Sequence, residues 1–143
     1  MPTCATVQRR VPGSCAWMAV VSLSIAGPTN ASAHPAAASE VPVHIGGEPG
    51  LDACGSQGRT TNLRRGQFLA VRTGPSVRHR LLDRLGSGRD LWLCELRFGW
   101  YAVVYATSGE DCGVSSEQAK RVAYRGPCRS GWVYARYVEL TAG

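Results

Sequence analysis

The sequence predicts an all-β fold in the form of a small barrel-like sheet. Short apolar and aromatic runs recur from residue 67 to residue 140, with turn residues between them. The 17 glycines and 8 prolines among 143 residues are typical of a chain with many turns. No window of about twelve residues has a helical period, and residues 116–123 come nearest to one. The predicted strands cover about 70 residues, which is small for a sandwich, and a closed barrel leaves no exposed sheet edge, so a barrel is favoured.

Residues 1–33 have the pattern of a secretory signal peptide. Arg9 and Arg10 give a positive start, residues 15–26 form an apolar run, and residues 31–33 read Ala-Ser-Ala, a small-x-small cleavage pattern. The apolar run is shorter than the roughly 20 residues that span a bilayer. We therefore expect cleavage before His34, with a retained anchor as the alternative. The mature protein would be periplasmic or secreted and would meet the membrane only through the cleaved signal.

Residues 34–66 are predicted to form a linker and an amino-terminal arm. Residues 34–50 are rich in Ala, Pro, Gly and Val and carry few charges, which is typical of an extended or poorly ordered segment. Residues 51–66 are polar and rich in glycine around Cys54. They predict a loop pinned by that cysteine, with a short strand near residues 60–63.

Five strands and a short sixth are expected between residue 67 and the end of the chain. The first two, 68–72 and 80–85, are separated by the turn Thr-Gly-Pro-Ser and followed by Gly-Ser-Gly. In the third, 91–96, Leu91 and Leu93 share one face while Trp92 and Cys94 share the other. The fourth, 100–105, precedes a polar insert, and the fifth is 131–134. One turn of 3₁₀ helix at 135–137 and a short strand at 138–140 complete the series.

Strand alternation also predicts which side chains lie inside the barrel. In the fourth strand, Trp100, Ala102 and Val104 lie opposite Tyr101, Val103 and Tyr105. The side chains expected inside are Val71, Leu82, Leu91, Leu93, Val103 and Val133.

Four cysteines follow the leader, at positions 54, 94, 112 and 128. An even number in a small exported domain indicates two disulfides, for which three pairings exist. We favour Cys112 with Cys128, because these two frame the insert, which leaves Cys54 with Cys94. A zinc site with four thiolates is the alternative, but such sites use closely spaced pairs that this chain lacks.

The strand series resembles bacterial SH3-type (SH3b) domains. Residues 69–76, Leu-Ala-Val-Arg-Thr-Gly-Pro-Ser, look like the family's L-N-V-R-x-G-P-S opening, with Ala70 in place of the usual Asn. Residues 99–103 are similar to its W-x-x-V strand, and residues 131–138 match its G-W-V-x-x-x-Y-L ending. Its V-x-x-L-x-x-G-x-x-V-x-V pattern falls on Leu82, Leu85, Gly88, Leu91 and Leu93.

This resemblance covers residues 67–141 and implies an SH3-like barrel of five to six strands. Two features depart from the family: the insert at 106–130, where the family has a short turn, and the cysteines. The chain therefore looks like a single-domain exported variant with a disulfide-stapled loop.

SH3b domains are generally binding modules, so the resemblance implies a non-catalytic module for cell-wall peptide, peptidoglycan or an envelope protein. An inhibitory or protein-interaction module acting through the 106–130 insert is the alternative, and a small hydrolase is a third hypothesis. Aromatic rings give large contact area at low entropy cost, which favours Tyr101, Tyr134 and Tyr137 as groove residues. Arg72 and Arg136 are candidates for bidentate contact with a carboxylate, with solvated arginines as the alternative.

No enzyme activity, cofactor or metal is expected. His34, His44 and His79 lie in no recognisable catalytic frame, and the acidic pairs Asp83 with Asp90 and Glu110 with Asp111 have no spacing that requires catalysis. The formal net charge of +6 includes two leader arginines. The insert combines basic residues with Tyr124, a pattern that binds nucleic acid, but export argues against that partner. We expect a monomer.

Overall fold

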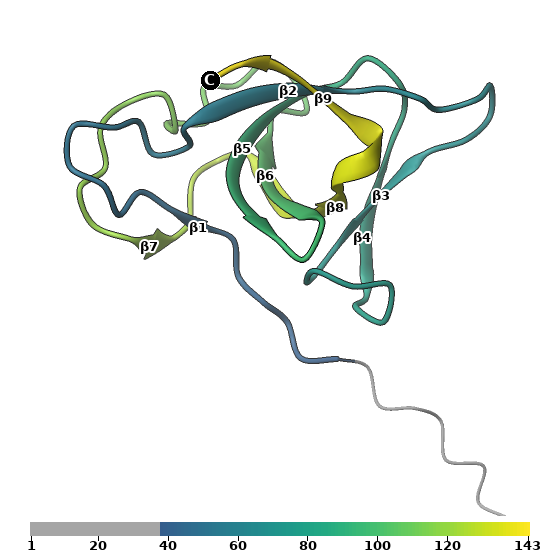
Figure 1. The fold of residues 1–143 in the computed structure, drawn as a ribbon, viewed down its shortest axis with the longest axis horizontal. Helices are drawn as coiled ribbons and strands as arrows, with labels where there is room; N and C mark the ends of the chain where they lie inside the picture. The colour runs from purple at the N-terminus through teal and green to yellow at the C-terminus, as the bar shows by residue number, and fades with distance from the viewer. Residues whose placement is uncertain (1–37) are drawn as a thin grey trace, which may run out of the picture. The chain divides into compact units, whose positions relative to one another are not determined.

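A computed structural model describes residues 38–143, which form an all-β unit with one 3₁₀ turn (Figure 1). The predicted leader and cleavage site lie outside these residues. The elements are β1 His44–Ile45, β2 Ser56–Thr60, β3 Leu69–Arg72, β4 Leu81–Leu85, β5 Asp90–Arg97, β6 Trp100–Tyr105, β7 Val122–Ala123, β8 Arg129–Tyr134, the 3₁₀ turn η1 Ala135–Tyr137, and β9 Val138–Ala142.

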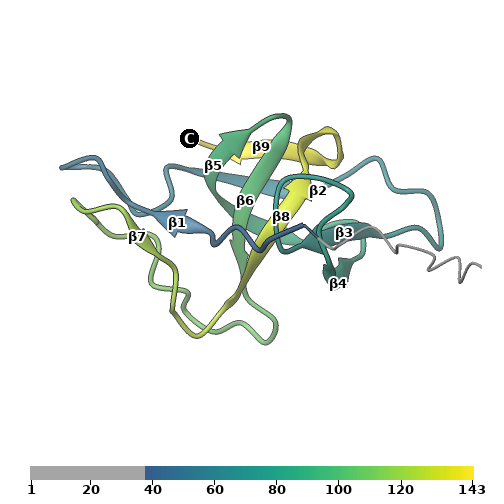
Figure 2. The ribbon, with the colours of Figure 1, turned by 90° about the horizontal axis from the view of Figure 1, so that it is seen from below.

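Seven strands form one antiparallel sheet in the order β4-β3-β8-β6-β5-β2-β9, and β1 pairs with β7 in a separate two-stranded sheet. The large sheet curls strongly, as Figure 1 shows around β5, β6 and β8. Its edge strands β4 and β9 are not paired with each other, so the sheet is open and the barrel is approximate. In both views the β1–β7 pair and the β3–β4 hairpin lie on opposite sides of strands β5 and β6 (Figures 1 and 2).

The predicted strand series and the 3₁₀ turn are confirmed, with small shifts at strand ends. The main difference is β2, which was expected near residues 60–63 and lies at Ser56–Thr60, between β5 and β9. The predicted domain boundary at residue 67 therefore cuts through the sheet. Only Gly58 and Thr60 of β2 are buried, so this strand carries almost no hydrophobic signal.

An inner core fills the concave side of the curled sheet. It consists of Leu69, Val71, Leu85, Leu91, Leu93, Val103, Tyr105 and Val133. Five of the six side chains predicted to lie inside are therefore confirmed. The prediction for Leu82 is wrong, because this residue is 41% exposed. In β4 the alternating positions Leu81, Asp83 and Leu85 are the less exposed ones, and Asp83 bonds to the buried Tyr105 hydroxyl.

An outer core covers the other face of β5, β6 and β8. It consists of Val43, Ala53, Cys54, Ala102, Val104, Cys112, Val114, Cys128 and Trp132. The arm and the insert supply most of these residues, because they form one layer over the sheet. The amide of Cys54 donates to the carbonyl of Val114 (3.1 Å), and the amide of Tyr124 donates to the carbonyl of Val43 (2.8 Å).

This layer includes one segment of the arm and one of the insert whose structure the sequence had left open. The arm was expected to be extended or poorly ordered; its residues Val41, Val43 and Ile45 pack in or against the outer core, and strand β1 lies in this segment. Residues 116–123, which came nearest to a helical period, contain no helix and end in strand β7. Both disulfides are present with the favoured pairing, Cys54–Cys94 and Cys112–Cys128. Within residues 38–143, no helix has the length and apolar character needed to cross a membrane.

Candidate functional site: an aromatic groove

A groove of about 730 Å³, in the range typical of ligand pockets, opens beside β3, β6 and the end of β8. Five segments build it: the β2–β3 loop, β3, the β3–β4 loop, the start of β6, and the end of β8 with η1. It is lined by Leu63, Gly66, Gln67, Phe68, Leu69, Ala70, Arg72, Ser76, Val77, Trp100, Tyr134 and Tyr137.

The groove lies where β3 and β8 are no longer paired. A single residue pair, Arg72 with Trp132, joins these two strands. The strands approach closely there because residue 131 is a glycine, and a Cβ at Gly131 would overlap the side chain of Val71. Beyond this crossing, Ala70 of β3 and Tyr134 at the end of β8 line the groove from its two sides.

Three aromatic rings form a connected wall of the groove. The ring centroids of Trp100 and Tyr134 are 5.5 Å apart at an interplanar angle of 46°, and those of Tyr134 and Tyr137 are 6.2 Å apart at 62°. These tilted and edge-on arrangements are favourable for aromatic pairs. The side chain of Tyr134 is 43% exposed, so its ring remains available to a ligand.

A fourth ring, Phe68, lines the groove from the β2–β3 loop. The guanidinium of Arg84 lies 4.9 Å from its centroid, within cation–π distance. Ala70 and Arg84 are paired across β3 and β4, so Arg84 lies on the groove face of the sheet. Arg72 lines the groove and donates from Nη1 to the carbonyl of His79 (2.8 Å), which joins β3 to the end of the β3–β4 loop.

Hydrogen bonds of the backbone amides shape the walls. The amide of Gln67 donates to the carbonyl of Arg64 (2.9 Å), and the amide of Arg64 donates to Oε1 of Gln67 (3.0 Å). These two bonds close a turn that directly precedes Phe68. The amide of Thr61 donates to the carbonyl of Tyr137 (2.9 Å), which ties the same loop to η1.

The β5–β6 hairpin adjoins the groove and carries an exposed aromatic residue. Phe98 and Gly99 form a two-residue connection with φ of 52° and 77°, as expected for a type I′ turn. Such turns prefer Asn or Gly, yet Phe98 is 86% exposed at this position. Trp100 follows directly and lines the groove.

Three of the five predicted ligand residues, Arg72, Tyr134 and Tyr137, line the groove together. The structure places Tyr101 and Arg136 outside the lining. Tyr101 packs against the inner core, since it alternates with Trp100 along β6. Arg136 lies on η1 between the two tyrosines and is exposed. Sequence reasoning missed Phe68, whose signal was an aromatic residue placed just before a strand.

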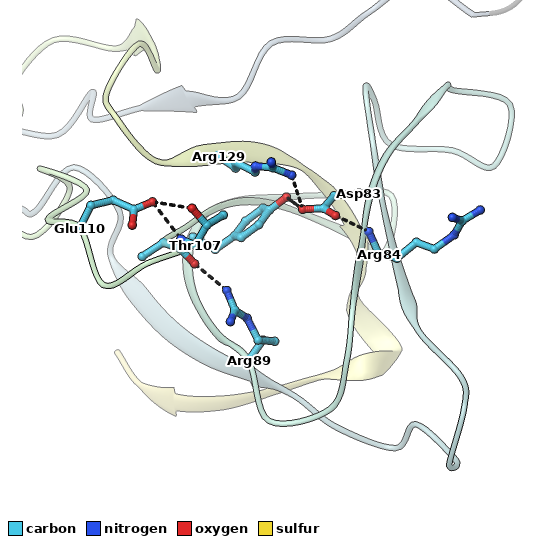
Figure 3. Close-up of polar contacts among 8 residues, drawn as sticks. Asp83, Arg84, Arg89, Thr107, Glu110 and Arg129 are labelled. Atoms are coloured by element: carbon cyan, nitrogen blue, oxygen red, sulfur yellow. Dashed lines mark hydrogen bonds and ion pairs between the residues drawn. The ribbon is translucent and has the colours of Figure 1, made fainter.

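Most candidate acid–base groups already have partners. Burial opposes ionisation of Asp83, but bonds from the Arg84 amide, the Tyr105 hydroxyl (2.9 Å) and Arg129 (3.0 Å) outweigh it and lower the pKa of this carboxyl (Figure 3). Burial and the bond to Asp83 raise the pKa of Tyr105. Asp90 is paired with Arg59 at 2.8 Å.

A carboxylate also organises the start of the insert. Glu110 accepts bonds from the amides of Thr107 (2.8 Å) and Ser108 (2.7 Å) and from the Thr107 hydroxyl (3.1 Å), part of which Figure 3 shows. The amide bonds favour the ionised form and lower the pKa of Glu110 to about 2, from an ordinary value of 4.5.

We expect a carboxyl titration of Glu110 in the folded protein to have its midpoint near 2. Because the folded pKa lies below the unfolded one, the stability contribution of Glu110 is complete above pH 4.5 and is lost as the pH falls toward 2. Side-chain carboxyl chemical shifts measured by NMR give the midpoint directly. A Glu110 midpoint near 4.5 would contradict the hydrogen-bonded turn.

The described residues contain no group of three or more His, Cys, Asp or Glu side chains arranged to hold a metal ion. Comparison of the chain with protein-family models, with curated proteins and with solved structures finds no match.

Proposed function

We propose that this protein is a non-catalytic, exported binding module that holds a cell-wall peptide or a segment of an envelope protein in the aromatic groove. The single observation that carries this proposal is the groove itself, in which Phe68, Trp100, Tyr134 and Tyr137 line one concave surface. Such rings offer large apolar contact with little rotamer entropy to lose on binding.

The disulfides support an exported location. Cys54–Cys94 and Cys112–Cys128 are consistent with an oxidising compartment, where such bonds form and persist. The predicted signal peptide agrees with this location. A periplasmic or secreted protein would meet wall peptides and envelope proteins rather than cytosolic partners.

Retention on isolated cell wall tests the proposal. We expect the disulfide-bonded protein to be retained at low salt, and Tyr134→Ala combined with Tyr137→Ala to weaken retention by about 30-fold, the effect of removing about 2 kcal/mol at a binding hot spot. Val122→Ala is the matched control, because Val122 is 41% exposed on β7, in the arm and insert layer. Circular dichroism must show that each variant is folded.

Equal retention of the tyrosine variant and the Val122 control would refute binding through the groove. Absence of any retention of the unaltered protein would refute the cell-wall form of the proposal and leave soluble envelope peptides as the ligands to titrate.

Deleting the insert would not be a clean test of the alternative, which is binding through the insert. Cys112, Val114 and Cys128 of the insert lie in the outer core against Trp132, so removing residues 107–127 would uncover that core. Reversing the charge of the exposed residues Lys120 and Arg125 leaves the packing in place. If these changes abolish retention and the tyrosine changes do not, the insert is the binding surface.

A further inference from the structure

The charged residues that line the groove or adjoin its lining are all positive. The residues that line it, and the residues next to them in the chain, include no aspartate or glutamate. Six arginines line the groove, stack on its wall or are adjacent in sequence to lining residues, and we call them the arginine rim. They are Arg64, Arg65, Arg72, Arg78, Arg84 and Arg136.

The arginine rim takes no part in the ion pairs of the described residues. Those five pairs use Arg59, Arg80, Arg97, Arg121 and Arg129. Outside the rim, residues 38–143 carry eight basic and ten acidic side chains. The net positive charge of these residues therefore resides entirely in the rim, while the remaining charges are close to balance.

Two rim arginines are held in place, one lining the groove and one stacked on the Phe68 ring. Arg84 lies over the Phe68 ring, which orients its guanidinium on the groove face. Arg72 is bonded to the carbonyl of His79 through one nitrogen. A guanidinium has five N–H donors, so such an arginine can still bind a carboxylate bidentately. Ordering the side chain in advance lowers the entropy cost of binding.

We propose that the groove selects an extended peptide with carboxylates on both sides of an apolar or aromatic residue. This inference rests on the proposed function and adds the ligand's charge. The aromatic wall would contact the central side chain, and the arginine rim would pair with the flanking Asp, Glu or terminal carboxylates. Charge complementarity of this kind speeds association and excludes basic partners.

A peptide fits these observations better than a nucleic acid. Both carry negative charge that arginine pairs with, but the two disulfides favour a compartment outside the cytosol. Free oligonucleotide therefore serves as a competing probe in the test.

Fluorescence anisotropy with the disulfide-bonded protein tests the inference. The probe is a labelled peptide with a central Leu-Tyr pair and two glutamates on each side, compared with versions carrying glutamine or lysine instead. We expect the glutamate peptide to bind at least about tenfold more tightly than the glutamine peptide at low salt. This difference in affinity should become smaller at 1 M salt, where charges are screened within about 3 Å. The lysine peptide should bind weakest.

Arg84→Gln combined with Arg136→Gln should lower affinity for the glutamate peptide about tenfold without affecting the glutamine peptide. Lys120→Gln combined with Arg125→Gln, which removes the same charge from the insert, should leave both affinities unchanged. Equal binding of the glutamate and glutamine peptides, with both lost in the Tyr134→Ala and Tyr137→Ala protein, would overturn the inference but support the proposed function. Tighter binding of a thymidine oligonucleotide, or binding of none of these probes, would overturn the inference, while the proposed function is judged separately by retention on isolated cell wall.

Discussion

Replacing Cys54 and Cys94 together by alanine is expected to lower the free energy of unfolding by about 4 kcal/mol. The two residues are 40 positions apart, and chain-entropy arguments give about this value for a closed loop of that length. The bond joins the arm to β5, and both sulfurs belong to or pack against the outer core. Since small domains have a total stability of about 5–15 kcal/mol, a folded but much weaker protein is expected.

Urea unfolding followed by circular dichroism measures this loss. Removing Cys112 and Cys128 is the matched comparison, for which the shorter separation of 16 residues gives about 3 kcal/mol. Amide exchange should rise at β1 and β7 when the Cys54–Cys94 bond is absent, because the arm then has one fewer anchor. A loss below about 1 kcal/mol would mean that the bond adds little to a layer already held by packing.

Trp132→Ala is expected to cost about 3–5 kcal/mol, because a fully buried aromatic side chain leaves a large cavity. The Trp132 indole N–H donates to the carbonyl of Val41 at 2.8 Å, and the Arg97 guanidinium lies 5.6 Å from its ring. This residue therefore joins the arm to β8. Trp132→Phe keeps most of the ring and removes the donor, so we expect a smaller loss together with faster amide exchange in the arm.

Trp100→Ala is the control for this prediction. Trp100 lies on the same face of the sheet, but it lines the groove and is only half-buried. Its replacement should cost less stability than that of Trp132 while weakening ligand binding. Equal stability losses for the two variants would contradict the conclusion that the arm and the insert cover Trp132 while Trp100 remains open to the groove.

Alternation along the strands predicted which side chains share a face, but it could not predict what covers each face. Leu91 and Leu93 were correctly placed opposite Trp92, and Val103 inside. Trp132 shows this limit, since nothing in its own strand indicates that the arm packs over it. A signal was present in the arm, where Val41, Val43 and Ile45 alternate, but Pro and Gly nearby obscured it.

The site was predictable in part for the same reason. Tyr134 and Tyr137 were predicted from the motif at the end of the chain. Phe68 was not, because it lies in the β2–β3 loop just before β3, outside any strand pattern. The arginine rim comes from five separate stretches of sequence, and only the folded sheet brings them around one groove. The bulge between Leu93 and Glu95 is likewise invisible in the sequence. At that bulge Cys94 bonds Cys54, and Glu95 pairs with Arg97 and with Arg121 of the insert.

Ligand binding in the aromatic groove can be followed residue by residue at the indole N–H signals of the tryptophans. Among the described residues these signals come from Trp92, Trp100 and Trp132, of which only Trp100 lines the groove. During titration of the nitrogen-15-labelled, disulfide-bonded protein with cell-wall peptides or the glutamate peptide, we expect the Trp100 signal to shift while the other two stay in place. Shifts at Trp92 or Trp132 with an unmoved Trp100 signal would contradict binding at this site.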